Sequence, residues 1–509
     1  MAESYVIGVD FGSDSVRALI VNTETGENVG QGVACYPRWK AGLYQHPEHS
    51  IFRQHPLDYL ESLEKCITTA LAELTEEQKD HVIGIGVDTT GSTPVPVDKN
   101  GTPLALLDEF AENENAMFFL WKDHAAAAEA DEINKLFRNN SENDYTKYQG
   151  DYSAEWYWAK ILYAVRHDEA IRQAAYTWEE HCDWMTGILC GETRPEKIYH
   201  SACAAGLPAA SVLEQLDPYL VQVRERYGNA PQPSTVKVGT LCPEWAKKLG
   251  LKESTVISGS SFDAHAGAVG AGIQKKTFVC TMGTSCVDMF VEKPENLKGK
   301  DIQAYCGQAE NSILPGYVGV ETGQAAFGDI FAWFKRLLEW PLEELPEEPF
   351  PIALDWFNGR RYPNTDDFQR SAISGLSLGM DAPYLYRSLV FGAVCGLYRL
   401  IEGFEKQEID IEKVIAVGGI SKKSPYVMQM LSDLSGREIH ILDSDQTCAQ
   451  GAAMYAAVGA GIYETLEVAA EHMAAKCIKI YKPDSEKKDW YKKHYQEYLK
   501  LAEAVNKLS

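Results

Sequence analysis

Two glycine turns, one in each half of the chain, constrain the fold more than any other feature of the sequence. The first lies in VIGVDFGSDSVRALIV, residues Val6 to Val21, and the second lies in FVCTMGTSCVDMFV, residues Phe278 to Val291. Each places a glycine and small hydroxyl residues between two apolar runs, a pattern typical of two buried strands joined by a tight turn. A hairpin of this kind in each half predicts that the second half repeats the plan of the first.

The segments around the two hairpins predict an α/β protein with two domains. In the first half, a three-stranded antiparallel meander over residues 5–36 precedes a helix, and VIGIGVDTTG then forms a buried strand of the type that helices cover on both faces. The order of strand, small-residue helix and hairpin follows again from residue 256. Because 509 residues exceed what one core usually holds, we expect a first domain over residues 1–255, with a helical insertion over residues 111–218, and a second over residues 256–509.

The composition excludes several classes of function. A formal net charge of −25 is the opposite of the basic surface that nucleic acid or an anionic membrane requires. No apolar run approaches the ~20 residues of a membrane span, and the chain enters its first strand without a signal peptide. Twelve cysteines are scattered singly, with no CxxC pair, as in a reduced intracellular protein. We therefore expect a cytoplasmic protein with no nucleic-acid and no membrane partner.

The two turns are candidate phosphate sites. A tight turn exposes consecutive backbone N–H groups, and a glycine lets a phosphate approach them closely. Ser13 and Ser15 in the first turn, and Thr284 and Ser285 in the second, add hydroxyl donors. Each turn alone is more typical of an ordinary hairpin, but two matching turns on facing domains favour a site that binds a triphosphate from both sides.

An acidic residue distinguishes the first turn from the second. Asp10 lies beside the first, whereas its counterpart beside the second is Thr281. A carboxylate next to bound phosphate repels it unless a cation lies between them, and Mg²⁺ is typically held by one or two carboxylates together with phosphate oxygens and waters. Asp10 is therefore a candidate Mg²⁺ ligand; the alternative is a strand-end aspartate bonded to backbone amides.

Two further segments carry candidate chemistry. Asp263 lies in GSSFDAHAG, where a strand becomes a helix; it is either a helix-capping aspartate or a general base that accepts a hydroxyl proton during phosphoryl transfer. We interpret the neighbouring His265 as structural. VGGISKKSP, residues Val417 to Pro425, places paired glycines after a strand, where a flat group such as adenine can lie against the backbone.

The order of DFGSDSVR, WKDH, FDAH, MGTS, PGYVGVETGQAAFGDIFAWF and GGISKKSP resembles the FGGY family of sugar kinases. The resemblance spans nearly the whole chain, and CYPRW, HPLDYLES and LDWFNGRR make it closest to the members that act on L-ribulose. It implies two ribonuclease-H-like domains flanking a deep cleft, the fold of the actin, hexokinase and heat-shock-70 ATPases. It also implies that ATP and L-ribulose give ADP and L-ribulose 5-phosphate with Mg²⁺, a step of L-arabinose catabolism.

The resemblance also implies roles for individual residues. It makes Asp263 the base that deprotonates the sugar hydroxyl, and it places Gly91 and Glu321 on the sugar. An ionised carboxylate such as Glu321 offers only acceptors, which suits sugar hydroxyls. The residues that it places on the nucleotide are Gly12, Ser13, Ser15, Arg17, Gly283, Thr284, Gly328, Gly418, Gly419 and Ser424.

Two joins depart from the family pattern. SACAAG runs directly into LPAAS at Gly206 and Leu207, where the family has a segment with a sugar-binding lysine, and only PEEPF links WPLEEL to PIALDWFNGRR. Either the protein lacks both segments, which puts the substrate in doubt, or the chain omits residues there. We favour the second interpretation, which predicts a separation well above about 3.8 Å between the Cα atoms of Gly206 and Leu207, and a break between Leu342 and Phe350.

Two alternatives remain open at this stage. One is an FGGY kinase for another ketose or polyol, and the other is an actin-like ATPase that is not a kinase and needs no sugar-facing base. The resemblance also implies a possible homodimer.

Overall fold

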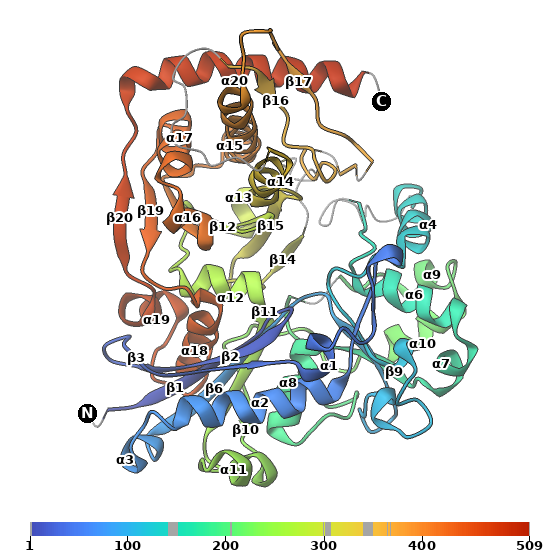
Figure 1. Cartoon of the computed structure of the whole chain (residues 1–509). Helices are drawn as coiled ribbons and strands as arrows, with labels where there is room; N and C mark the ends of the chain where they lie inside the picture. The colour runs from blue at the N-terminus through green and yellow to red at the C-terminus, as the bar shows by residue number, and fades with distance from the viewer. Residues whose placement is uncertain are drawn as a thin grey trace.

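Two β-sheets, one above the other, form the framework of the molecule in the computed structural model (Figure 1). The structure describes residues 3–140, 151–203, 206–298, 300, 307–338, 350–363, 365–366 and 368–507. The first sheet comes mainly from the N-terminal half and the second from the C-terminal half, so the predicted two-domain α/β architecture is confirmed.

The first sheet has six strands in the order β10-β11-β6-β1-β2-β3. Their bounds are β1 (Tyr5–Phe11), β2 (Ser15–Asn22), β3 (Asn28–Cys35), β6 (Val82–Thr89), β10 (Lys237–Thr240) and β11 (Val256–Phe262). The predicted meander is therefore confirmed, with β1, β2 and β3 antiparallel, whereas β6 and β11 run parallel to β1. Because β1, β6 and β11 are parallel neighbours, they end at one edge of the sheet.

Every residue of β1 is buried, because both faces of the first sheet are covered. Ile7 and Val9 pack in one hydrophobic cluster with α2 (Pro56–Leu71), and Val6 packs on the opposite face with α18 (Thr447–Gly459). The alternation follows from the two-residue period of a strand.

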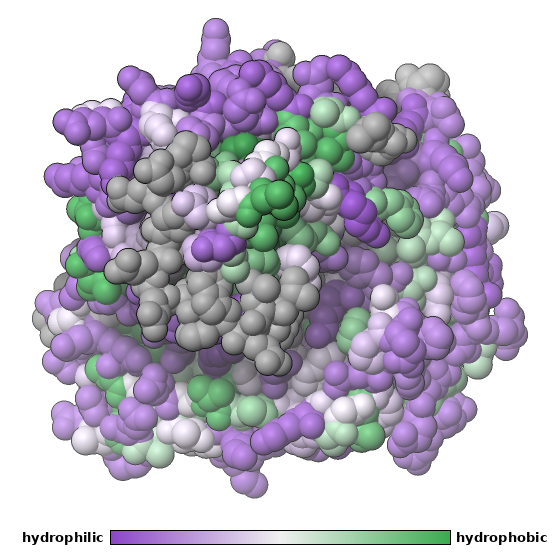
Figure 2. All heavy atoms as spheres, turned by 45° about the horizontal axis from the view of Figure 1, so that its top comes forward, coloured by the Kyte–Doolittle hydropathy of each residue, from purple (hydrophilic) through white to green (hydrophobic). Residues whose placement is uncertain are grey.

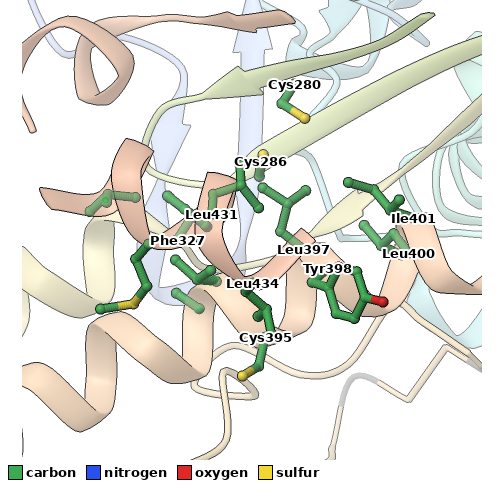
Figure 3. Packing of buried hydrophobic residues seen from close by; sticks show 14 of the residues in the cluster. Cys280, Cys286, Phe327, Cys395, Leu397, Tyr398, Leu400, Ile401, Leu431 and Leu434 are labelled. Carbon is green, nitrogen blue, oxygen red and sulfur yellow. The ribbon is translucent and has the colours of Figure 1, made fainter. Parts of the chain in front are cut away.

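The second sheet has seven strands in the order β14-β15-β13-β12-β18-β19-β20. Their bounds are β12 (Thr277–Met282), β13 (Cys286–Glu292), β14 (Gln308–Glu310), β15 (Val318–Gln324), β18 (Lys413–Val417), β19 (Ile439–Leu442) and β20 (Cys477–Tyr481). Cys280 of β12 and Cys286 of β13 face Leu397 and Leu431 in the core of this domain (Figure 3). The helices around this core are α14 (Gly328–Leu338), α15 (Ala382–Lys406), α17 (Pro425–Ser435) and α20 (Ser485–Asn506).

Small residues let two helices cross closely between the sheets, where Figure 1 shows α12 (Asp263–Gly270) and α18. A β-carbon added at Gly270 or Gly451 would collide with the backbone of the other helix. The strand β11, which precedes α12, belongs to the first sheet although it begins at residue 256. The sequence-based boundary at residue 255 thus separates β11 from the sheet it joins, and we propose that the domains meet between β11 and α12.

The predicted insertion is rich in helices among its described residues. It includes α4 (Ala127–Arg138), α6 (Tyr157–His167), α8 (His181–Cys190) and the start of α10 (Pro218–Arg226). The first join, at Gly206 and Leu207, follows residues 204–205, which lie outside the described residues. The interpretation that residues are omitted at this join therefore stays a prediction. The second join falls in residues 339–349, outside the described residues.

The surface agrees with the acidic composition. Figure 2 shows a face that is mostly hydrophilic, interrupted by several small hydrophobic patches. Among the described residues, no helix has the length and apolar character that a membrane crossing requires. The cysteines in the described part of the chain are all free thiols.

Candidate functional site

Three carboxylates converge where β1, β6 and β11 end. Asp10 of β1 is the register partner of Asp88 of β6, and Asp88 is in turn the partner of Ser261 of β11. Asp263 follows β11 directly and is the first residue of α12. Sequence reasoning identified Asp10 and Asp263 but missed Asp88. The signal for Asp88 was an acid near the end of the buried strand VIGIGVDT.

Burial and mutual repulsion govern this acidic cluster. Burial raises the pKa of Asp10, and Arg17, whose Nη1 lies 3.0 Å from Asp10 Oδ2, opposes the shift. Burial and the charges of Asp10 and Asp263 raise the pKa of Asp88 well above its usual range. A side-chain hydrogen bond joins Asp10 and Asp88, and among the described residues the side-chain oxygens of Asp88 have no other partner. Two adjacent carboxylates fit Mg²⁺, which binds few carboxylates and keeps other positions for phosphate and water.

Asp263 has the properties of a general base. Burial and the charge of Asp10 raise the pKa of Asp263 to about 7, near the pH at which a base accepts a proton most effectively. Its Oδ1 accepts a hydrogen bond from the backbone N–H of Ala264 at 2.7 Å. The sequence left a capping role and a catalytic role open. The N-cap of α12 is Phe262, and no side chain caps this helix, so the capping alternative is wrong.

The first turn is held rigidly from three sides. The indole of Trp121, from the motif WKDH, donates to Ser13 Oγ at 2.8 Å, and Gln54 Nε2 donates to the Ser13 carbonyl at 2.7 Å. Tyr36 donates to the carbonyl of Gly12 at 3.0 Å. In the described part of the chain, the amides of Ser13 and Asp14 have no hydrogen-bond partner, so they are available to an anion. Ser15 lies at the start of β2 and is buried.

Three of the predicted glycines meet at the second turn. A β-carbon at Gly328 would lie 2.5 Å from the carbonyl oxygen of Gly283, and one at Gly418 would lie 2.5 Å from that of Met282. Gly418 also has a φ of +89°, which favours glycine. The amide of Thr284 is exposed, with no hydrogen-bond partner among the described residues. The structure thus assembles Gly283, Gly328 and Gly418 as one glycine-lined surface.

Gly419 and Ser424 lie beyond this contact. A β-carbon at Gly419 would meet no atom within 4 Å, so open space adjoins its backbone. Ser424 is the N-cap of α17, and its Oγ accepts from Val427 N at 3.4 Å. Ser424 therefore has a structural role that is independent of any nucleotide.

The two residues predicted to hold a sugar both adjoin the start of α12. Gly91 follows β6, and a β-carbon there would overlap the ring of Phe262. The loop continues into Thr93, whose amide donates to Glu180 Oε2 at 2.8 Å. Glu321 lies on β15, and its side chain keeps 37% of its exposure. Both Asp263 and Glu321 thus adjoin the start of α12, and the charge of Glu321 contributes to the raised pKa of Asp263.

Comparisons with known sequences agree with this arrangement. Residues 5–205 match the FGGY family of carbohydrate kinases, N-terminal domain, and residues 278–460 match its C-terminal domain. A protein of Vibrio parahaemolyticus named ribulokinase is 41% identical over 549 alignment positions that cover 100% of this chain and 97% of the relative. A ribulokinase of Shouchella clausii is 34% identical, with 98% of this chain and 94% of the relative covered.

Solved structures share the fold at lower identity. A xylulose kinase from Rhodospirillum rubrum has a TM-score of 0.82 and 18% identity, with 99% of each chain covered. A gluconate kinase from Lactobacillus acidophilus has a TM-score of 0.80 and 17% identity, with 100% of both chains covered. At this identity the likeness establishes the fold and not the substrate.

Proposed function

The chain belongs to the FGGY family of carbohydrate kinases, and on that premise we propose that it uses ATP to phosphorylate L-ribulose, giving ADP and L-ribulose 5-phosphate. The observation that carries the proposal is Asp263, a carboxylate with a pKa of about 7 beside two further carboxylates at the ends of parallel strands. Full-length relatives named ribulokinase support L-ribulose as the sugar. Family membership does not support the alternative of an ATPase that is not a kinase.

The proposed chemistry is a direct in-line transfer. The sugar hydroxyl loses its proton to the carboxylate of Asp263 as its oxygen forms a bond to the γ-phosphorus of ATP, and the bond from that phosphorus to the β–γ bridging oxygen breaks to release ADP. Asp10 and Asp88 would hold Mg²⁺, which neutralises charge on the phosphate oxygens. Arg17 stays paired with Asp10 on the side facing the first turn.

In the proposed complex, the two turns and the glycine-lined surface contact different parts of the nucleotide, so both domains bind it. In this proposal the exposed amides near Ser13 and Thr284 bind phosphate oxygens. The open backbone at Gly419 accommodates adenine beside Gly418, and Gly328 keeps the second turn close to the start of α14. Gly91 and Glu321 contact the sugar beside Asp263.

The shortened join at Gly206 is the reason that the identity of the sugar substrate needs a direct test. It lacks the lysine that the family resemblance places on the substrate, so a second ketose or polyol remains the alternative. ADP release should be measured with purified protein, ATP and Mg²⁺ over L-ribulose, D-ribulose, L- and D-xylulose, glycerol and gluconate. We expect the highest kcat/KM with L-ribulose. A higher value with another compound would replace L-ribulose, and release independent of every added acceptor would contradict kinase function.

We further propose that the protein is cytoplasmic and forms a homodimer. The free cysteines of the described residues and the net charge of −25 suit a reducing, soluble compartment. Sedimentation analysis should give a mass near twice 56.6 kDa. A mass of one chain at micromolar concentration would contradict the dimer.

A further inference from the structure

A chain of side-chain contacts links the two halves of the molecule beside Asp263. Cys203 Sγ lies 3.0 Å from His265 Nδ1, and His265 Nε2 lies 3.3 Å from Glu321 Oε2. Cys203 belongs to the N-terminal half, His265 to α12 and Glu321 to β15. Cys203 Sγ also lies 3.1 Å from the carbonyl oxygen of Ser312. The contacts thus connect an N-terminal loop to the second sheet through the helix that begins with Asp263.

The donors and acceptors in this series of contacts determine which group donates each hydrogen bond. The carbonyl oxygen of Ser312 can only accept, so the thiol of Cys203 donates to it. His265 Nδ1–H then donates to the sulfur, and Nε2–H donates to the carboxylate of Glu321. This assignment satisfies every member and makes His265 an imidazolium.

The surroundings of His265 favour its charged form. Its side chain is buried, which lowers its pKa, but the contacts with Cys203 and Glu321 outweigh burial and raise the pKa well above its usual range. Asp263 lies two residues away with a carboxylate of its own. A buried cation therefore stands among the acids that adjoin the start of α12.

We propose that Cys203 and His265 form a positioning unit that holds the carboxylate of Glu321 in one orientation for the sugar hydroxyls. This inference rests on the proposed function, since it concerns how Glu321 binds the sugar in the same site. One oxygen of Glu321 contacts His265, and the Glu321 side chain is 37% exposed. The imidazolium also supplies positive charge to a sugar site whose shortened join lacks the family's lysine.

The test separates orientation of the sugar from folding and from nucleotide binding. His265→Ala should raise the KM for the ketose about 10- to 100-fold, the range for losing a hydrogen bond to a charged group, with the KM for ATP within twofold. His265→Gln, whose amide can donate to Glu321, should restore part of the loss. Cys203→Ser should have a smaller effect, because a hydroxyl can replace both contacts of the thiol.

A matched cysteine–histidine pair outside the site provides the control. Cys477 Sγ lies 3.6 Å from His440 Nδ1 on β20 and β19. His440→Gln and Cys477→Ser should leave the KM for the ketose unchanged. Thermal melting of every variant should show whether it is folded.

Three outcomes would overturn the proposal. They are an unchanged ketose KM in folded His265→Ala, an equal loss of ketose and ATP binding in that variant, and no rescue by His265→Gln. If His265→Ala does not fold, ¹⁵N-histidine NMR of the wild type replaces it. The Nε2–H signal of His265 is the one that is absent from the spectrum of His265→Gln. This signal must shift when ketose is added without nucleotide, and an unshifted signal would overturn the proposal. A wild type that uses no ketose would instead refute the proposed function.

Discussion

The two glycine hairpins share one framework and differ in the side chains beside the turn. Asp10 lies two residues before Gly12, and Thr281 lies two residues before Gly283. The antiparallel partner of Asp10 is Arg17, whereas that of Thr281 is Val287. Both hairpins turn at a glycine, although the paired strand ends are Phe11 and Val16 in the first and Met282 and Cys286 in the second, which makes the second loop one residue shorter. Only the first hairpin adds an ion pair beside the turn.

The strands that run parallel to β1 and β12 differ in the same way at their ends. Asp10 pairs with Asp88 on β6, and Thr281 pairs with Val417 on β18, which the glycines 418 and 419 follow. In the proposed function, the acids at both strand ends of the first hairpin would hold the cation, and the apolar strand end followed by glycines would accommodate the adenine ring. The comparison therefore attributes the proposed difference between the two sides to a few strand-end residues.

The largest effect is expected from replacing Asp263, the proposed general base. Asp263→Ala should lower turnover on the order of 10²–10⁴-fold, because the variant lacks the carboxylate that accepts the hydroxyl proton. Binding of a fluorescent ATP analogue should survive, because Asp263 acts on the sugar hydroxyl and belongs to neither phosphate-binding turn. Near-normal turnover in this variant would remove Asp263 from the mechanism.

Asp88→Asn should lower the activity of the protein and raise its thermal stability. Without an ionised Asp88, turnover at fixed Mg²⁺ should fall by about 10²-fold, the range for losing one preorganised electrostatic group. The raised pKa of Asp88 means that its ionisation costs folding energy as pH rises above its unfolded pKa. The metal-free variant should therefore melt at a higher temperature than the wild type at pH 8. A lower melting temperature would show that Asp88 is not strained by its neighbours.

Thr281→Asp tests whether the missing acid matters at the second hairpin. A carboxylate there should repel the phosphates and raise the KM for ATP about tenfold, or roughly 1.4 kcal/mol. Thr281→Asn, of nearly the same size but neutral, is the control and should bind ATP like the wild type. Equal KM values for the two variants would mean that the second turn does not contact phosphate.

The pH profile tests the proposed base in the unmodified protein, with an effect of about tenfold at pH 6. Asp263 acts as a base only when deprotonated, and its pKa is raised to about 7. Below pH 7, kcat/KM for the ketose should fall about tenfold per pH unit, and above pH 8 it should be level. A profile that is level down to pH 5.5 would contradict a base with this pKa.

Local patterns allowed much of this framework to be predicted from the sequence. Both hairpins, the meander and the buried strand Val82–Thr89 follow from apolar runs punctuated by turn residues, and each forms as expected. The comparison of Asp10 with Thr281 is also local, since it depends only on distance from a turn glycine. These features require no knowledge of how strands pair at long range.

Long-range pairing explains what the sequence did not predict. Asp88 carries the same strand-end signal as Asp10, but only the sheet order, with β6 between β1 and β11, places it among the acids. β11 joins the first sheet after a long insertion, which moves the proposed boundary past residue 255. Cys203 and His265 are 62 residues apart, so no local pattern indicates their contact.

The central claim is that the acidic hairpin side holds the cation and the glycine side holds the nucleotide. Crystals grown with a non-hydrolysable ATP analogue, Mn²⁺ in place of Mg²⁺ and the ketose should be examined by anomalous scattering. The account predicts Mn²⁺ beside Asp10 and Asp88, with adenine over Gly419 and a sugar hydroxyl within hydrogen-bond reach of Asp263. Mn²⁺ bound away from both aspartates, or adenine on the side of Gly12, would contradict it.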